Sequence, residues 1–280
     1  MSLADMAEVP AWTSGGDYTS ILYETLGPVA RISHHRPQAR NAQNTPLLDE
    51  LDAAMQRAVA DEAVRVIIIA GTGDHFSAGH DLKEAINERG HYTVEQRWEY
   101  EATRYYGYAM NIWDAPKPTI AQVQGACIAG AFMVANMCDL MVASEDAYFA
   151  DPVCQTLASA SVEVLCHPWV MGLRKAKEFL FTGAKMSAEE AHRIGMVNRL
   201  VPRADLEAET LALAQQIART PPFALALTKR ALNRTADFQG FRNALSAHFD
   251  THQVTHVTSE TQRLRQAGAG VAIGSGRTER

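Results

Sequence analysis

The spacing of apolar residues predicts an alternation of strands and helices in the first part of the chain. Residues 20–25 and 29–34 are short strand-like runs, and Leu26-Gly27 between them is typical of a hairpin turn. Residues 64–70 (VRVIIIA) are almost continuously apolar and β-branched, as expected of a strand that is buried on both faces. Two further strands are predicted at residues 119–123 and 140–143.

Helical spacing separates these strands. Thr45 is a good N-cap and Pro46 suits a first helical turn, and an apolar stripe then continues to Val59. Residues 93–113 and the small-residue stretch 130–137 predict two more helices. Strand, turn, helix and strand in this order are typical of right-handed βαβ winding.

The pattern becomes helical after about residue 170. Ser187 and Glu190 form a capping box at the start of one of the predicted helices. These helices span residues 174–182, 187–194, 204–219, 222–234 and 238–264. We therefore expect an α/β core over residues 1–200 and a helical region over 201–266. The Gly- and Ser-rich tail, residues 267–280, is expected to be disordered.

Composition and charge narrow the class of protein. The chain has 280 residues, of which 47% are hydrophobic, so it can bury a large core without disulfides. This excludes a disordered chain and a collagen-like chain, and the length suggests two domains or one domain with an appendage. The formal net charge is -6, which argues against nucleic acid as a partner because phosphate binding requires a basic surface.

The sequence favours a cytoplasmic protein. Residues 1–17 contain neither the apolar core of a signal peptide nor an Arg-rich transit pattern. Residues 118–138 carry no charge, but Gln and Asn side chains interrupt the stretch, so we expect no membrane span. The cysteines are expected to be buried free thiols, as in a reducing compartment. They are Cys127, Cys138, Cys154 and Cys166.

One local pattern occurs twice. Residues 64–70 are followed by Ser77-Ala78-Gly79-His80, and residues 119–123 by Ile128-Ala129-Gly130-Ala131. Each is a strand, then a loop that contains Ala-Gly, then the start of a helix, where backbone N–H groups lack partners. Two such turns on neighbouring strands can direct two N–H donors at one oxyanion. The alternative is that small residues only permit close packing of helix on sheet.

The order and spacing of several segments over residues 18–235 resemble the enoyl-CoA hydratase/isomerase family, also called the crotonase family. These segments include Arg36-Pro37 with Asn41-Ala42, residues 76–83 (FSAGHDLK), 125–131 (GACIAGA), 138–140 (CDL), 149–152 (FADP), 180–183 (LFTG) and 191–198. The resemblance implies a crotonase-like ββα superhelix that binds acyl-CoA thioesters. It also implies a C-terminal helical trimerisation region and a homotrimer or hexamer. Coenzyme A would arrive as part of the substrate, and no separate cofactor is implied.

The resemblance also assigns binding residues. It implies that the backbone N–H groups of His80 and Gly130 hold the thioester oxygen. The loop residues Ala78, His80, Asp81, Leu82 and Lys83 match the CoA-contacting loop of the family, and Lys83 is the candidate for a CoA phosphate. An aromatic cluster follows this loop and is expected to form core or to shape the acyl pocket. Its members are Trp98, Tyr100, Tyr105, Tyr106 and Tyr108.

The chain departs from the family at the two positions where hydratases of the family carry glutamates. These positions hold Met133 and Val153, neither of which can transfer a proton. Hydration by a glutamate pair is therefore not supported, and crotonyl-CoA hydration is expected to be absent or very slow.

Four other side chains are candidates for an acid or base. Asp151 lies in the loop that supplies an Asp in other branches of the family; alternatively, it caps the following helix. Glu163 is the only charged residue in an apolar stretch, where burial would raise its pKa; alternatively, it faces solvent or a subunit interface. His80 can point into the pocket or to solvent, and His167 is expected to make a structural hydrogen bond. We rank Asp151 above Glu163.

Three histidines share one face of a predicted helix. His248, His252 and His256 are four residues apart, a spacing that suits a metal ion. The sequence shows no further cluster of ligands, and the segment is expected to lie far from the thioester site. We therefore expect a polar helix face and no metal.

These observations leave three functions open. The first is an acyl-CoA enzyme that stabilises a thioester enolate through two backbone N–H groups. The second, motivated by the missing glutamates, is a catalytically inactive protein that binds acyl-CoA. The third is a structural subunit that assembles with active homologues. Neither nucleic acid nor a membrane is expected as a partner.

Overall fold

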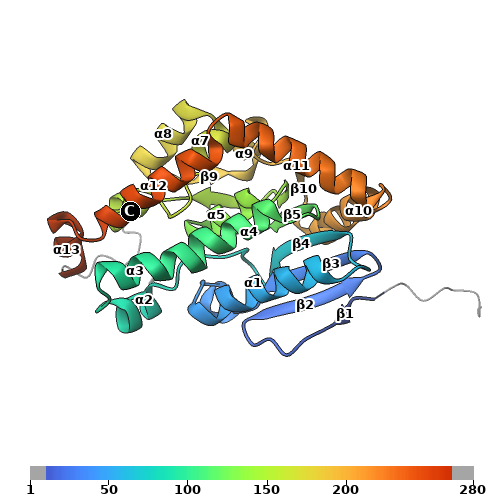
Figure 1. Cartoon of the computed structure of the whole chain (residues 1–280), viewed down its shortest axis with the longest axis horizontal. Helices are drawn as coiled ribbons and strands as arrows, with labels where there is room; N and C mark the ends of the chain where they lie inside the picture. The colour runs from blue at the N-terminus through green and yellow to red at the C-terminus, as the bar shows by residue number, and fades with distance from the viewer. Residues whose placement is uncertain (1–10, 267–280) are drawn as a thin grey trace, which may run out of the picture.

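The computed structural model describes residues 11–266, and its centre is a twisted sheet (Figure 1). Within these residues seven strands pair in the order β1-β2-β3-β4-β5-β7-β10. The pairs β1–β2 and β2–β3 are antiparallel, and all later neighbours are parallel. The strands are β1 (Thr13–Ser14), β2 (Ile21–Leu26), β3 (Val29–His34), β4 (Val66–Gly71), β5 (Thr119–Val123), β7 (Leu140–Ser144) and β10 (Arg199–Val201).

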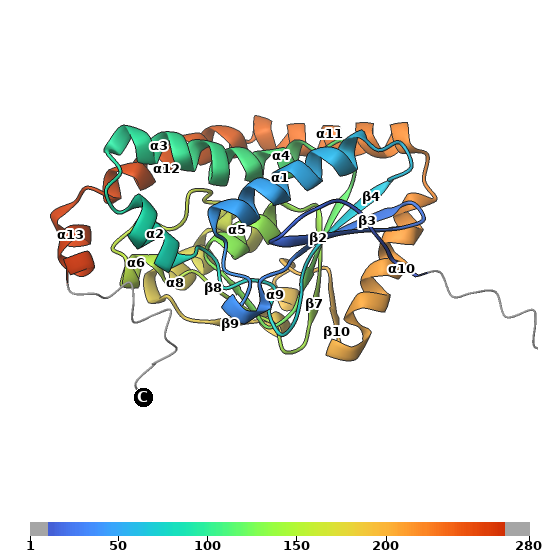
Figure 2. The same cartoon turned by 90° about the horizontal axis from the view of Figure 1, so that it is seen from below.

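The central strand β4 is buried on both faces, as its sequence predicts. Ile67 and Ile69 pack in the core that includes α1 (Thr45–Ala60). Ile68 faces the opposite way, into a smaller core beneath α10 (Leu206–Ala218). Figure 2 shows the sheet between these layers, with α1 and α10 on opposite sides. This arrangement confirms the expected α/β architecture.

A second, three-stranded sheet lies beside the first. It has the order β6-β8-β9, with β6 (Ala126–Ile128), β8 (Tyr148–Ala150) and β9 (Met186–Ser187). The connecting helices are η1 (Pro37–Ala39), α2 (Leu82–Arg89), α5 (Gly130–Met137), α6 (Val153–Thr156), α7 (His167–Met171), α8 (Leu173–Thr182), α9 (Ala188–Arg193) and η3 (Arg203–Asp205). Since β6, β8 and β9 contain two or three residues each, their patterns are too short to predict from apolar spacing.

Within residues 11–266, three helices follow α10. These are α11 (Pro222–Phe238), α12 (Phe241–Thr255) and α13 (Ser259–Gln266). Phe241 and Leu245 of α12 pack in the main core. Lys229 of α11 is buried and lies 2.8 Å from a carboxylate oxygen of Asp139. This contact ties α11 to the α/β core. The prediction of one helix over 238–264 is wrong, because the chain turns between α12 and α13.

Other local predictions also need correction. The predicted helix at 93–113 is α3 (Val94–Glu101), a π-helical turn η2 (Ala102–Gly107) and α4 (Tyr108–Asp114) in succession. The N-cap of α1 is Asn44 and not Thr45, since the Asn44 side chain accepts a hydrogen bond from the N–H of Leu47. Cys154 is exposed, whereas the other three cysteines are buried.

Two further sequence predictions concern the C-terminal tail and the absence of a membrane span. Residues 267–280, where a disordered tail is expected, lie outside the described residues. Among residues 11–266, no helix is both long enough and apolar enough to cross a membrane.

Candidate functional site

The two Ala-Gly turns predicted from the sequence lie side by side. The N–H of Ser77 donates to the carbonyl of Ala126 at 3.0 Å, and the N–H of Ile128 donates to the carbonyl of Ser77 at 3.2 Å. Gly79 has a φ of +84°, and a Cβ at this position would lie 2.4 Å from the carbonyl oxygen of Ile128. Only glycine therefore allows this approach.

Gly130 is the first residue of α5, where a backbone N–H has no partner within the helix. A Cβ on Gly130 would lie 2.7 Å from Cε1 of His80 and 2.5 Å from Oε1 of Gln43. The N–H of Gln43 donates to the carbonyl of Gly79, and the N–H of Asp81 donates to the carbonyl of Gln43. Because these two groups on either side of His80 face Gln43, the N–H of His80 points to the opposite side of this extended segment. The start of α5 and the His80 segment are thus in contact.

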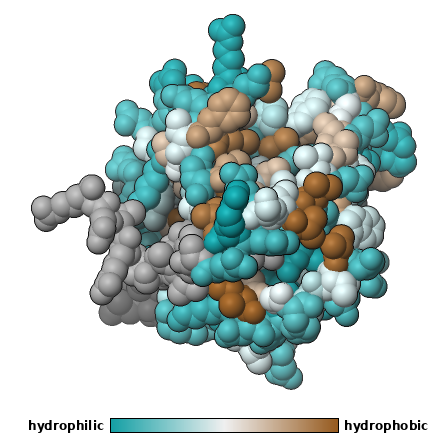
Figure 3. Space-filling model, turned by 90° about the vertical axis from the view of Figure 1, so that its left-hand side faces the viewer, coloured by the Kyte–Doolittle hydropathy of each residue, from teal (hydrophilic) through white to brown (hydrophobic). Residues whose placement is uncertain are grey.

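A cavity of about 380 Å³ begins at His80. Its wall combines α2, α3, the segment 153–163 and α12, which are distant in sequence. The lining residues are His80, Leu82, Ala85, Ile86, Arg89, Gly90, Arg97, Glu101, Tyr105, Val153, Thr156, Leu157, Ser159, Ser161, Val162, Glu163, His252, His256 and Leu264. Ile86 is 51% exposed, so the cavity reaches the surface beside α2. Figure 3 shows this end of the molecule, where hydrophobic patches lie among hydrophilic residues.

His80 and Glu163 form a buried pair inside the cavity. Nε2 of His80 lies 3.3 Å from Oε2 of Glu163, and their side chains are 14% and 5% exposed. Burial opposes the charge on His80, but the Glu163 carboxylate outweighs burial and raises the pKa of His80 above its usual value. Burial likewise opposes the charge on Glu163, but His80 and His252 hold the pKa of this carboxyl well below its usual range. The expectation of a raised pKa for Glu163 is therefore wrong, because its neighbours are basic.

The histidines of α12 reach the same cavity. Nε2 of His252 lies 3.7 Å from Oε1 of Glu163 and 3.7 Å from Oε2 of Glu101. Nε2 of His256 lies 3.2 Å from the same oxygen of Glu101. The expectation that this helix lies far from the site is wrong. His248 instead turns its Nε2 to the carbonyl of Val162, at 2.9 Å.

Asp151 and His167 form a separate buried pair that is not part of the cavity lining. Oδ2 of Asp151 accepts a hydrogen bond from the hydroxyl of Ser161 at 2.9 Å and lies 3.1 Å from Nε2 of His167. The His167 ring stacks on Phe132, with centroids 4.6 Å apart. Asp151 does not cap α6, whose N-cap is Pro152 without a side-chain hydrogen bond. Of the two carboxylates ranked from the sequence, Glu163 therefore lines the cavity, whereas Asp151 is buried outside it.

Val153 and Met133, the two apolar residues expected from the sequence to stand in place of glutamates, lie in different environments. Val153 lines the cavity, so an apolar side chain occupies this part of the wall. Met133 is buried in the main core on α5 and does not line the cavity. In the aromatic cluster noted in the sequence, Tyr105 lines the cavity and contacts the His80 ring edge-on, with ring centroids 4.2 Å apart. Trp98 of the same cluster is 46% exposed.

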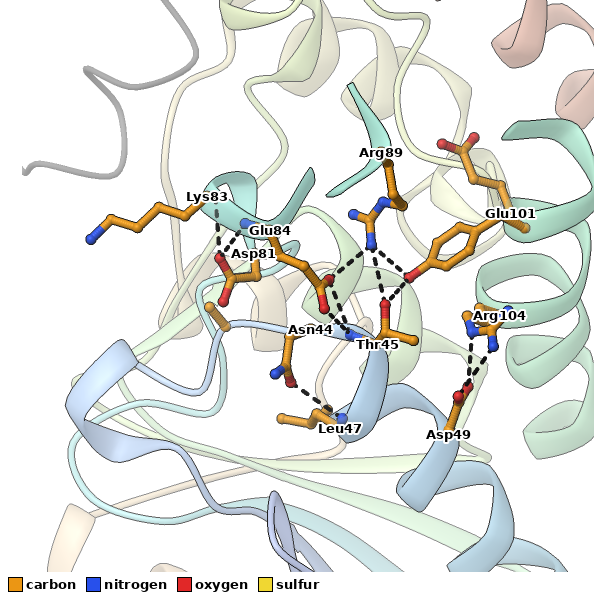
Figure 4. Close-up of polar contacts among 12 residues, drawn as sticks. Asn44, Thr45, Leu47, Asp49, Asp81, Lys83, Glu84, Arg89, Glu101 and Arg104 are labelled. Carbon is orange, nitrogen blue, oxygen red and sulfur yellow. Dashed lines mark hydrogen bonds and ion pairs between the residues drawn. The ribbon is translucent and has the colours of Figure 1, made fainter. Parts of the chain in front are cut away.

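The loop that ends at Lys83 is fixed by Asp81. The carboxylate of Asp81 accepts hydrogen bonds from the N–H groups of Lys83 and Glu84, and it lies 2.9 Å from a guanidinium nitrogen of Arg36. The Lys83 side chain is exposed and extends away from the fold (Figure 4). Ala78 and Leu82 belong to the same loop, and Leu82 lines the cavity.

A polar network next to this loop supports the cavity wall. Arg89 lies 2.8 Å from a carboxylate oxygen of Glu84 and donates to the hydroxyl of Tyr100 at 2.6 Å (Figure 4). Glu84 also accepts a hydrogen bond from the N–H of Thr45 at 2.9 Å. The network joins α1, α2 and α3, so the wall of the cavity is tied to the core.

The sequence did not indicate Arg89, Arg97 or Glu101 as lining residues. They lie on helices whose charged side chains are also compatible with a solvated face, and only the tertiary fold turns them inward. No local motif marks them, but the four-residue spacing of His252 and His256 indicated a shared helix face. The carboxylate opposite that face could not be inferred from spacing.

Comparisons with known proteins agree with this architecture. The sequence profile of the family described as enoyl-CoA hydratase/isomerase matches residues 24–269. EchA13 of Mycobacterium tuberculosis, which carries an enoyl-CoA hydratase name, is 41% identical over 260 residues, 86% of this chain and 82% of that protein. The crystal structure of an enoyl-CoA hydratase/isomerase from Xanthobacter autotrophicus Py2 has a TM-score of 0.86 and 37% identity, covering 94% of this chain and 100% of that one. A Mycobacterium smegmatis structure named for enoyl-CoA hydratase has a TM-score of 0.80 and 50% identity, covering 84% and 94%.

Proposed function

The chain belongs to the enoyl-CoA hydratase/isomerase family, and from this premise we propose that it forms a thioester enolate from an acyl-CoA. The thioester oxygen lies between the backbone N–H groups of His80 and Gly130. These donors stabilise the negative charge that develops when a proton leaves the carbon next to the carbonyl. The close approach of the His80 segment to the start of α5 supports this assignment.

The acid and base are His80 and Glu163. The pKa of Glu163 is held below its usual range and that of His80 is raised, so the pairing favours a carboxylate on Glu163 and an imidazolium on His80. The carboxylate accepts the proton from the acyl chain, and the imidazolium can return a proton to the enolate. The observation that carries the proposal is the 3.3 Å distance between these side chains in the cavity, together with the close approach of the His80 ring to Gly130.

Deuterium exchange tests the proposal. The protein is incubated with butyryl-CoA in D2O, and deuterium incorporation at the carbon next to the thioester carbonyl is followed by nuclear magnetic resonance. We expect exchange with the wild-type protein and a loss of about 10²- to 10⁴-fold in Glu163→Gln, because a positioned base contributes that much. Glu99→Gln on the exposed face of α3 removes the same charge outside the cavity and is the matched control.

A second function, binding of acyl-CoA without chemistry, is favoured by the apolar Val153 in the cavity wall. Calorimetry with butyryl-CoA and with crotonyl-CoA distinguishes the two functions. Binding without exchange would support the inactive protein, and the absence of both binding and exchange would overturn the acyl-CoA assignment. Free crotonate is the control for recognition of the CoA portion.

A further inference from the structure

We propose that Glu101, His252 and His256 form a binding site for a divalent transition-metal ion, with Zn²⁺ as the best match. The three side chains come from α3 and from the C-terminal end of α12. Each offers one ligand atom, and these atoms all lie within 4.8 Å of one another. The site is additional to the enolate chemistry proposed above, and its existence does not depend on that chemistry.

The spacing of the three ligand atoms fits one shared ion. The two Nε2 atoms of His252 and His256 lie 3.1 Å apart. Oε2 of Glu101 lies 3.2 Å from Nε2 of His256 and 3.7 Å from Nε2 of His252. A tetrahedral zinc ion with bonds of about 2.0–2.2 Å requires ligand atoms about 3.3–3.6 Å apart. Small adjustments of the side chains would therefore suffice to close the site around an ion.

Two of the three ligands, His252 and Glu101, have outer contacts of the kind that orient metal ligands. Nδ1 of His252 lies 3.4 Å from the carbonyl oxygen of Ala160, which favours a proton on Nδ1 and a free electron pair on Nε2. The carboxylate of Glu101 accepts a hydrogen bond from the side-chain amide of Gln253 at 2.6 Å. Such outer contacts orient ligands and raise metal affinity.

Charge and burial also favour a cation here. The side chains of Glu101 and Glu163 are 7% and 5% exposed, so two carboxylates are buried in one cavity. Arg97 lies 3.6 Å from the other oxygen of Glu101, and His80 pairs with Glu163.

The ligand set leaves room for a fourth ligand. All three residues line the cavity, so a fourth coordination position faces the space where an acyl group would lie. Two histidines and one carboxylate with an open position are the donors of many zinc sites that retain a bound water. Nothing in the proposal requires that water to react.

Metal titration of the full-length protein tests the site. After treatment with a chelator, the protein is titrated with ZnCl₂ by calorimetry at pH 7.5, and separately with CoCl₂ while the visible spectrum is recorded. We expect one Zn²⁺ per chain and a visible Co²⁺ absorption typical of four-coordinate nitrogen and oxygen ligands. His256→Gln and Glu101→Gln are each expected to raise the Zn²⁺ Kd by at least about 100-fold, because ligand loss costs no less than loss of an outer contact.

His248→Gln is the matched control, since His248 lies on the same helix and turns toward Val162. This variant should bind Zn²⁺ with unchanged affinity. Thermal unfolding gives a second measurement: Zn²⁺ should raise the Tm of the wild type and of His248→Gln but not of His256→Gln. Equal Zn²⁺ affinity in wild type and His256→Gln, or no saturable binding in the wild type, would overturn the site. The three side chains would then form a hydrogen-bonded cluster without an ion, and the exchange experiment above would be unaffected.

Discussion

Nε2 of His80 lies 3.3 Å from Oε2 of Glu163, so an imidazole that follows β4 meets a carboxylate from the segment between α6 and α7. The two groups stabilise each other's charged forms in a place where burial alone would neutralise both. In the function proposed above, this pair supplies the proton acceptor and the proton donor.

Removal of the Glu163 charge is expected to reverse the pKa shift of His80. In the wild type the carboxylate outweighs burial and the His80 pKa lies above 6.5. In Glu163→Gln burial remains and the opposing charge is lost, so the His80 pKa should fall below 6.5. Titration of the imidazole signals by nuclear magnetic resonance measures both values. A His80 pKa that stays above 6.5 in the variant would contradict the pairing.

Asp151→Asn is expected to affect stability and not proton exchange. Asp151 is fully buried, bonded to Ser161 and adjacent to His167, and it does not line the cavity. Replacing the carboxylate by an amide weakens these contacts and should lower the free energy of unfolding by about 1–3 kcal/mol. Urea unfolding and the deuterium-exchange rate are measured on the same sample. Full stability together with a large loss of exchange would restore Asp151 as the candidate base.

Much of the fold could be predicted because its central elements are long and strongly patterned. The strands at 29–34 and 119–123 and the helix at 130–137 have the predicted limits. The short strands of the second sheet were missed, because two or three residues show no period. The interruption after α12 was also missed, since the apolar spacing continues across it.

The site could be predicted only where the backbone requires a particular residue type, such as glycine. The Ala-Gly turns indicated the contact between the His80 segment and Gly130, because glycine is required for that approach. The pairing of His80 with Glu163 is a tertiary contact between polar side chains and follows from no periodicity. The sequence ranks Asp151 above Glu163 by its position in the loop. In the structure the Glu163 side chain lines the cavity and the Asp151 side chain does not, and this difference cannot be predicted from loop position.

Gly130→Ala is expected to fold but to lose proton exchange. The new Cβ would meet the ends of two side chains, His80 and Gln43, which can shift at a cost of about 1–3 kcal/mol. The shift moves the His80 ring and crowds the N–H of Gly130. Loss of one such donor costs about 10²- to 10³-fold in rate. Exchange into butyryl-CoA and urea unfolding measure the two effects.

Gly79→Ala should destabilise the fold more than Gly130→Ala. The new Cβ would lie 2.4 Å from the backbone carbonyl oxygen of Ile128, which cannot move aside as a side chain can, and residue 79 has a φ of +84°. We expect a loss of at least about 3 kcal/mol in the free energy of unfolding. Gly27→Ala is the control for the backbone conformation alone, since Gly27 has a φ of +55° and nothing lies within 4 Å of its Cβ position. It should lose about 1–2 kcal/mol. Equal losses at both positions would contradict the close packing of the two turns.

His34 is expected to make the stability of the fold depend on pH. The ring is fully buried at the end of β3, and burial lowers its pKa from 6.5 to about 4. As the pH falls below 6.5, the unfolded chain binds a proton at this position, while the folded chain remains neutral until about pH 4. Stability therefore decreases over this interval as the pH falls.

The variant His34→Gln isolates this contribution from that of the carboxylates, which titrate in both proteins. Urea unfolding of each protein is measured at pH 7.5 and at pH 5.0. At about 1.4 kcal/mol per pKa unit, the wild type should lose about 2 kcal/mol more than the variant between these pH values. A comparison of pH differences cancels any direct effect of the substitution on packing, because that effect is present at both pH values. An equal decrease in the free energy of unfolding of both proteins would contradict this account. His34 would then take up its proton in the folded state as readily as in the unfolded chain, and its burial against Phe76 would not exclude the charge.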